Sequence, residues 1–295
     1  MNWILATLLA AAAQTARNAM QSGLVASLGT LGATQVRFLY GFPFALLFLA
    51  IAACASPLPV PSASPRFLAF TASGAVAQIL ATAVLLAAMR RGSFSVATAL
   101  SKTEAVQIAV FGLVLLGDAL TPLRAVAIAV ATTGVALTAV KPGERWTAAG
   151  LPPVLLGIGA GAGFALAAVG FRGGVLALGE GPYWLRATAT LAWSLGLQTL
   201  LLGLWMLAFA HGALWKSILL WRQSVLAGLL GAVASQFWFV GFSLTAAANV
   251  RTLGLVEVLF ANLVGWRLLR QPSSARQQVG MGLIVAGVGL LLIGT

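Results

Sequence analysis

Residues 99–137 read ALSKTEAVQIAVFGLVLLGDALTPLRAVAIAVATTGVAL, and residues 252–290 read TLGLVEVLFANLVGWRLLRQPSSARQQVGMGLIVAGVGL. The two stretches align without a gap, so that Glu104 falls on Glu257. Shorter segments of similar sequence upstream of each stretch extend the match over nearly the whole chain. The sequence therefore consists of two similar halves, and this internal repeat decides which folds we consider.

The composition is that of an integral membrane protein. Of the 295 residues, 60% are hydrophobic and 7% are charged, and the mean hydropathy is +1.00. A soluble domain carries about 25% charged residues. The net charge of +12 comes mostly from Lys and Arg in short breaks between apolar runs, which indicates membrane topology and not nucleic-acid binding. Because Cys54 and His211 are single, we expect no disulfide, no metal and no cofactor.

Apolar runs of membrane-spanning length recur along the chain. About 20 mostly apolar residues cross a bilayer as a helix. This measure predicts ten transmembrane helices, at residues 3–25, 32–53, 67–88, 94–116, 121–140, 148–171, 183–208, 223–246, 250–268 and 276–294. We therefore expect an all-α integral membrane protein, with five-helix repeats in residues 1–145 and 146–295 that form one membrane domain.

An odd number of crossings in each half has a topological consequence. The second half must enter the membrane from the side opposite to the first, so the two repeats are inverted. Inverted repeats are typical of secondary transporters, in which two similar bundles rock against each other and expose a site to either side in turn. The repeat therefore predicts a carrier that works by alternating access.

A polar stripe interrupts the first predicted span. Gln14, Arg17, Asn18 and Gln21 are spaced i, i+3, i+4 and i+7, which places them on one face of a helix. Lipid would leave these groups without hydrogen-bonding partners, so the face must point inward. Hydrogen bonds between helices explain a single Asn or Gln equally well, but four polar residues on one face favour the lining of a cavity.

Other spans hold further candidates for the same cavity. Gln78 and Gln236 occupy equivalent places in the two halves and add to the case for cavity lining. Phe164 and Trp238 also lie within predicted spans, where packing against the core or lipid is the commoner role of an aromatic residue and cavity lining the less common one.

Lys102, Glu104 and Glu257 are three of the ionisable residues in the two aligned stretches. Lys102 and Glu104 are two positions apart on a helix, so they point to different sides and do not pair directly. We expect Glu104 to meet an arginine from another helix. A structural ion pair and a proton relay both remain open for Glu104 and Glu257, and we favour the ion pair. Arginines in other spans that could serve as partners are Arg17, Arg37 and Arg186.

Glycines recur at the spacing that lets helices approach closely. The stretches GIGAGAG (157–163) and GMGLIVAGVG (280–289) both contain small residues four positions apart. We expect tight helix contacts at both stretches.

The repeat also carries a family resemblance. The segments KTEAV (102–106) and LVEVL (255–259) place a carboxylate at equivalent positions, and a Gly-rich last helix follows in each half. With ten spans in two halves, this pattern resembles the EamA family of the drug/metabolite transporter superfamily. The chain departs from the family pattern at Ala105 and Val258, where the family usually has proline.

The resemblance implies a function and a site. The chain is similar to the bacterial aromatic amino acid exporters of that family, which implies a multi-pass protein of the bacterial inner membrane. A central cavity would bind a small molecule, and the partners would be that substrate and the lipid bilayer, with no nucleic acid and a monomeric chain. The alternative is a broad-specificity multidrug or nucleotide-sugar carrier. A membrane-embedded enzyme is less favoured, because it would need a nucleophile with its base or a metal site, and the sequence offers few residues for either. The candidate substrate-binding residues are Gln14, Arg17, Asn18, Gln78, Phe164, Gln236 and Trp238, and the possible coupling or structural charges are Lys102, Glu104 and Glu257.

The distribution of basic residues predicts the orientation. The breaks after the third, fifth, seventh and ninth spans hold nine Lys and Arg residues, and the opposite breaks hold four. By the positive-inside rule the nine lie in the cytoplasm, so both termini are periplasmic. A C-terminal green fluorescent protein fusion should therefore stay dark, and bright fluorescence would contradict this orientation. The nine residues are Arg90, Arg91, Lys141, Arg145, Lys216, Arg222, Arg267, Arg270 and Arg276.

Overall fold

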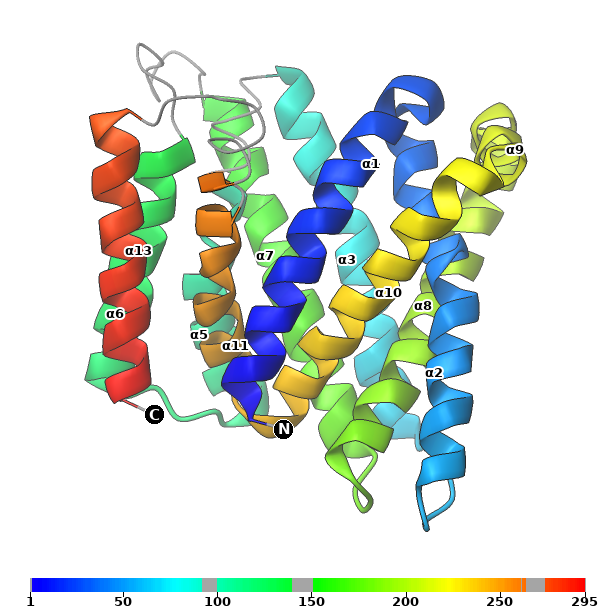
Figure 1. Ribbon diagram of the computed structural model, residues 1–295, viewed down its shortest axis with the longest axis horizontal. Coiled ribbons are helices and arrows are strands. Elements are labelled where there is room, and N and C mark those ends of the chain that lie inside the picture. The colour runs from blue at the N-terminus through cyan, green and yellow to red at the C-terminus, as the bar shows by residue number, and fades with distance from the viewer. Residues whose placement is uncertain (1, 92–99, 140–150, 261, 264–273, 295) are drawn as a thin grey trace. The chain divides into compact units, whose positions relative to one another are not determined.

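The computed structural model of the chain describes residues 2–91, 100–139, 151–260, 262–263 and 274–294 (Figure 1). All regular secondary structure in these residues is helical, which confirms the predicted all-α class. Most of the described part of each predicted span is helical. In chain order the elements are α1 (Trp3–Leu39), α2 (Gly41–Ala55), α3 (Pro65–Arg91), α5 (Glu104–Leu116), α6 (Pro122–Ala139), α7 (Leu151–Ala177), α8 (Tyr183–Phe209), α9 (His211–Leu219), α10 (Trp221–Leu244), α11 (Ala247–Leu253), the 3-10 helix η2 (Gly254–Val256) and α13 (Ala275–Ile293).

Several of these helices have the length and composition of membrane spans. Within the described residues, six helical stretches are long and apolar enough to cross a bilayer, and two shorter apolar helices, Glu104–Leu116 and Pro122–Thr138, accompany them. This is the pattern of a multi-pass membrane protein. The count of ten crossings stays a prediction. The boundary at residues 145 and 146 lies outside the described residues, so the division into repeats there stays a prediction too.

A glycine turn divides α1 into two segments. Gly29 has φ 65° and ψ 176° in the middle of the helix, a conformation that glycine adopts at little cost and other residues avoid. The chain turns back at this point and continues through the second segment of α1 into α2 (Figure 1). The turn falls between the first two predicted spans, as the hydropathy pattern indicates. α1 thus contains the first predicted span and the start of the second, which continues into α2.

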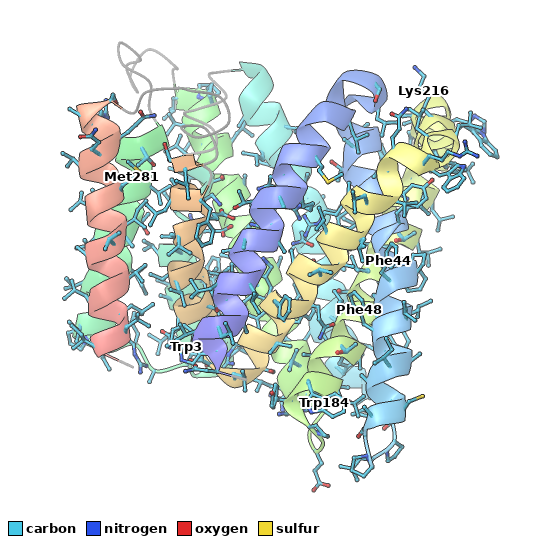
Figure 2. The ribbon with its side chains drawn as sticks, viewed as in Figure 1. Trp3, Phe44, Phe48, Trp184, Lys216 and Met281 are labelled. Atoms are coloured by element: carbon cyan, nitrogen blue, oxygen red, sulfur yellow. The ribbon has the colours of Figure 1, made fainter. Side chains whose placement is uncertain are left out.

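The break between α8 and α10 is not a plain loop. His211 lies between the predicted spans 183–208 and 223–246, and in the structure it begins the short helix α9 and accepts a hydrogen bond from Trp215 Nε1 at 2.8 Å. Figure 2 shows Lys216 of α9 at one end of this part of the molecule and Trp3 and Trp184 at the other. Tryptophans and lysines at both ends of apolar helices are typical of the two membrane interfaces.

The chain divides into two compact units by its internal contacts. Unit 1 comprises residues 1–76 and 170–245, and unit 2 comprises residues 77–169 and 246–295. Unit 1 thus contains α1, α2, α8, α9 and α10, with one end each of α3 and α7. Unit 2 contains α5, α6, α11, η2 and α13, with the rest of α3 and α7. Each unit combines segments from both halves of the sequence.

In unit 2, α13 packs directly on α6. A Cβ atom added at Gly287 would lie 2.5 Å from the backbone N of Ala131, and one added at Gly134 would lie 2.6 Å from the carbonyl O of Gly280. Higher residue numbers on α6 meet lower numbers on α13, so the two helices are antiparallel (Figure 1). The predicted tight contact at residues 280–289 is confirmed for Gly280 and Gly287.

The second glycine stretch also packs closely within unit 2. A Cβ atom at Gly161 of α7 would lie 2.9 Å from the carbonyl O of Ser101, and one at Gly163 would lie 2.8 Å from the Cβ of Ala81 on α3. The glycines therefore allow α7 to touch both the start of α5 and the helix α3. This confirms the predicted helix contact at residues 157–163.

Candidate functional site

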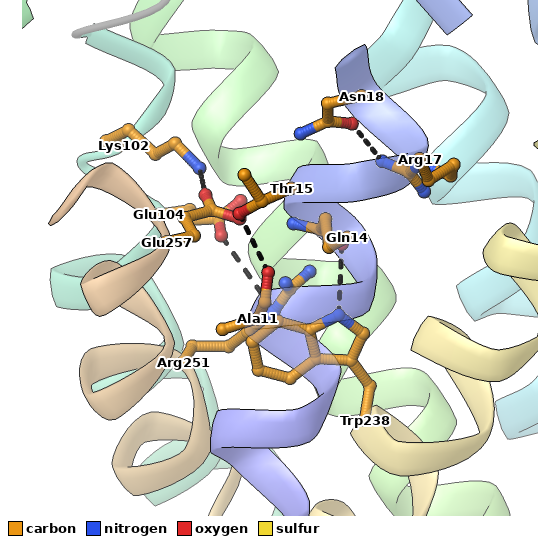
Figure 3. A network of polar contacts seen from close by, with 10 residues as sticks. All are labelled: Ala11, Gln14, Thr15, Arg17, Asn18, Lys102, Glu104, Trp238, Arg251 and Glu257. Carbon is orange, nitrogen blue, oxygen red and sulfur yellow. Dashed lines mark hydrogen bonds and ion pairs between the residues drawn. The ribbon is translucent and has the colours of Figure 1, made fainter. Parts of the chain in front are cut away.

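Two of the predicted site residues hydrogen-bond to each other in unit 1. Trp238 Nε1 on α10 donates to Gln14 Oε1 on α1 at 3.0 Å (Figure 3). The Trp238 side chain is buried and Gln14 is half-buried. A buried indole N–H needs an acceptor, and Gln14 supplies it from a neighbouring helix. The pair places an aromatic ring and an amide next to each other within apolar helices.

The next turn of α1 carries the charged part of the polar stripe. Arg17 is 7% exposed, and its Nη2 donates to Asn18 Oδ1 at 2.6 Å (Figure 3). Asn18 itself is exposed. The next residue of the same helix, Asn18, thus holds one end of the Arg17 guanidinium. The side chain of Gln21, the fourth stripe residue, lies outside the described ones.

The remaining candidates have different surroundings. In unit 1, Gln236 Nε2 donates to Thr188 Oγ1 on α8 at 2.7 Å. This bond is a contact between helices, the role that the sequence left open for single polar residues. In unit 2, Gln78 is buried on α3, and Phe164 is half-buried on α7. Their place in a common site with the unit 1 residues stays a prediction.

The other aromatic residues near Trp238 form part of the core of unit 1. The rings of Phe171 and Phe239 have centroids 5.0 Å apart, and those of Phe239 and Phe242 lie 6.1 Å apart. All three side chains are almost completely buried. They pack α7 against α10 and thereby support the backbone that carries Trp238.

A cluster of four charges lies in unit 2. Lys102 Nζ donates to Glu257 Oε1, and Arg251 Nε of α11 lies 3.9 Å from Glu104 Oε1 (Figure 3). All four side chains are largely buried. As expected from their spacing, Lys102 and Glu104 have different partners, and Glu104 meets an arginine from another helix. Each carboxylate is thus neutralised by a cation from the other half of the sequence.

Sequence reasoning missed Arg251. It is not among the arginines that the sequence suggested as partners of Glu104, and the structure places it on α11 with a side chain 15% exposed. Its position six residues before Glu257, inside a nearly uncharged stretch, was the available signal. In the residues that the structure describes, no three His, Cys, Asp or Glu side chains come together as a possible metal site. The arrangement offers hydrogen bonds, a buried indole and paired charges.

Comparison with known proteins gives a family match over the first 140 residues and a shared fold over nearly the whole chain. Residues 1–140 match the model of the EamA-like transporter family, which confirms the resemblance seen in the sequence. No curated protein matches the chain. A solved crystal structure superposes with a TM-score of 0.75 over 98% of this chain and 96% of its own, at 15% sequence identity. That identity supports a shared fold and carries no information on the substrate.

Proposed function

We propose that this chain, whose first 140 residues match the EamA-like transporter family, is a secondary transporter that exports amino acids with aromatic or other apolar side chains, or related small metabolites. It would act by alternating access through a central cavity, as a multi-pass protein of the bacterial inner membrane and not as an enzyme. The observation that carries the proposal is the hydrogen bond between Gln14 and Trp238.

The chemistry of this pair suits such a substrate. Polar side chains within membrane helices are costly and usually mark a site or a helix contact. Small-molecule sites combine apolar and aromatic walls with a few polar groups that fix orientation. Trp238 supplies an aromatic surface and Gln14 an amide at the same place. A ligand with an apolar side chain and a polar end matches both groups.

The contact between α6 and α13 supports inverted repeats of five helices. The two helices are equivalent in the internal alignment, which pairs Gly134 with Gly287 and Ala131 with Ile284. A Cβ atom at Gly134 would meet Ile284, and one at Gly287 would meet Ala131. The internal alignment converts one of these contacts into the other, so the two contacts are equivalent. Equivalent helices that run antiparallel are what inversion requires, and inversion is typical of alternating-access carriers.

Transport by the purified protein in liposomes tests the proposal. We expect saturable uptake of labelled phenylalanine or tryptophan that exceeds uptake by protein-free liposomes. The panel also contains a nucleotide sugar and a lipophilic cationic drug, the substrates of the alternative carrier types. Uptake of one of these, without uptake of any amino acid, would replace the proposed substrate class.

Loss of the Gln14 amide should impair transport without unfolding the protein. We expect Gln14→Leu and Asn18→Leu each to reduce the rate of export by about tenfold, the effect of losing one hydrogen bond of roughly 1.4 kcal/mol. The measurement is efflux from loaded liposomes at matched protein content. Thr15→Val on the same helix is the control, because Thr15 Oγ1 donates only to the carbonyl O of Ala11 at 2.9 Å, within its own helix. Normal export by both leucine variants would restore the interpretation as helix contacts.

A further inference from the structure

The short helix α9 lies across one end of unit 1. Figure 1 shows α9 almost end-on, whereas α2 and α8 of the same unit run lengthwise through the picture. Tyr40, between α1 and α2, holds α9 in this place, because its hydroxyl lies 3.0 Å from the carbonyl O atoms of both Ser217 and Ile218. A helix that crosses the ends of membrane spans in this way lies in the plane of the membrane interface.

The faces of α9 differ in their surroundings. On one face, Ser217 is fully buried, and its Oγ lies 3.3 Å from the carbonyl O of Gly32 on α1. On another face, Trp215 and Leu219 are four positions apart and are 47% and 73% exposed. Lys216 is exposed as well, at the end of this part of the molecule (Figure 2). An apolar face beside a cation is the composition of helices that lie in a lipid interface.

A second exposed cation follows directly after α9. Arg222 lies in the first turn of α10, and its Cζ atom is 5.3 Å from the ring centroid of Trp221, which is also exposed. The sequence from residue 181 to residue 256 contains no Asp or Glu. The surface formed by α9 and the start of α10 therefore combines two cations with two exposed indole rings, and this stretch of the chain supplies no acidic residue to compensate them.

An apolar groove of unit 1 begins near this surface. It lies between α2 and α8, has a volume of about 390 Å³, and is lined by apolar side chains and one glycine. Phe42 lines it and is two positions after Tyr40, whose hydroxyl contacts α9. Leu46 and Trp193 line it too, and both are exposed, so the groove opens outward from the two helices. A groove of this size and composition accommodates an apolar chain.

We propose that α9 and the start of α10 bind the head group of an anionic phospholipid, and that the groove between α2 and α8 holds one of its acyl chains. Lys216 and Arg222 supply the positive charge that an anionic head group requires, and a guanidinium binds phosphate through two parallel hydrogen bonds. Trp215 and Trp221 place amphipathic rings at the depth of the head groups. The inference goes beyond transport and does not depend on the identity of the substrate.

Native mass spectrometry of the purified full-length protein tests the site, because it reports bound lipid and oligomeric state together. The probes are phosphatidylglycerol and phosphatidylcholine with identical acyl chains, so that only the head group differs. For the wild-type protein we expect half-occupancy at a phosphatidylglycerol concentration about tenfold or more below that of phosphatidylcholine, because two basic residues at an anionic head group each contribute to binding. Equal occupancy by the two lipids would overturn the proposal.

Substitution of the two cations tests the head-group part of the site. The double variant Lys216→Gln with Arg222→Gln should lose the preference for phosphatidylglycerol. Arg66→Gln is the matched control, because Arg66 is also an exposed arginine of unit 1 beside an aromatic ring, with its Cζ atom 5.8 Å from the ring centroid of Phe70. This control should keep the full preference. A preference that survives in the double variant, or that is lost equally in Arg66→Gln, would contradict the role of α9.

Filling the groove tests the acyl-chain part. Leu46→Trp puts a larger side chain into the groove and should raise the concentration of either lipid needed for half-occupancy by several-fold. Leu47→Trp is the matched control, because Leu47 is exposed on the same helix and does not line the groove. Equal lipid binding by the two variants would overturn the groove as the chain site. A wild-type dimer without lipid preference that Leu46→Trp converts into a monomer would assign this face to a second copy of the chain and overturn the lipid site.

Discussion

We expect Glu257→Gln to lower the unfolding temperature of the purified protein in detergent sharply. The substitution leaves the Lys102 ammonium group in a largely buried place without its carboxylate partner. Removing one member of a buried ion pair costs about 3–5 kcal/mol, because the remaining charge has lost both water and its partner. Intrinsic tryptophan fluorescence during heating measures the change. Glu180→Gln is the control, because Glu180 is exposed and should have little effect.

A double-mutant cycle measures the interaction between Lys102 and Glu257 apart from the effect of each residue alone. Lys102→Met combined with Glu257→Met removes both charges, and the double variant should be more stable than either single variant. Additive losses would contradict the ion pair. Glu104→Gln should act in the same direction but less strongly, because the Arg251 Nε to Glu104 Oε1 distance is 3.9 Å.

The same variants distinguish a structural role from a coupling role. If the two carboxylates are structural, flux driven by a substrate gradient in liposomes stays largely intact in Glu104→Gln and Glu257→Gln, and an imposed pH gradient has no effect on either. Should wild-type flux follow the pH gradient and one variant lose that response while it still exchanges substrate, that carboxylate carries protons. The buried cations opposite both carboxylates favour the structural role.

The second large effect is expected from Gly287→Leu on α13. A Cβ atom there would lie 2.5 Å from the backbone N of Ala131 and 2.8 Å from the carbonyl O of Ala127, and backbone atoms cannot move aside as a side chain does. The two helices must separate, at a cost of more than about 1–3 kcal/mol. We expect a large loss of folded protein in size-exclusion chromatography. Gly289→Leu is the matched control, since nothing lies within 4 Å of a Cβ atom at that position. Equal yields of the two variants would contradict the close packing.

Hydropathy predicted the helical segments because each depends on the local composition of the chain. The turn at Gly29 also has a local cause, since a glycine with positive φ lies between two apolar runs. The glycine contacts at Gly161 and Gly287 were predictable as contacts from spacing alone. Their partners were not, because the partner depends on which helix is adjacent.

The charge partners show the limit of sequence reasoning most clearly. The spacing of Lys102 and Glu104 correctly indicated different partners, but the structure pairs Glu104 with Arg251, which was not among the arginines suggested. Likewise, the structure bonds Gln236 to Thr188, a partner that the sequence did not indicate, and the place of Gln236 in a cavity stays a prediction. Such choices depend on the rotation of each helix about its axis, and a one-dimensional pattern fixes the face of a helix but not its neighbour.

The ion pair between Lys102 and Glu257 joins two residues that the ribosome makes at very different times. Its members are 155 residues apart in the chain. At about 5–20 residues per second, the ribosome needs roughly 10–30 s to produce Glu257 after Lys102. During that time Lys102 and the adjacent helix α5 are already made, and Lys102 has no glutamate from the second half. The nascent chain must therefore keep this part beside the insertion machinery or in contact with water until the later helices arrive.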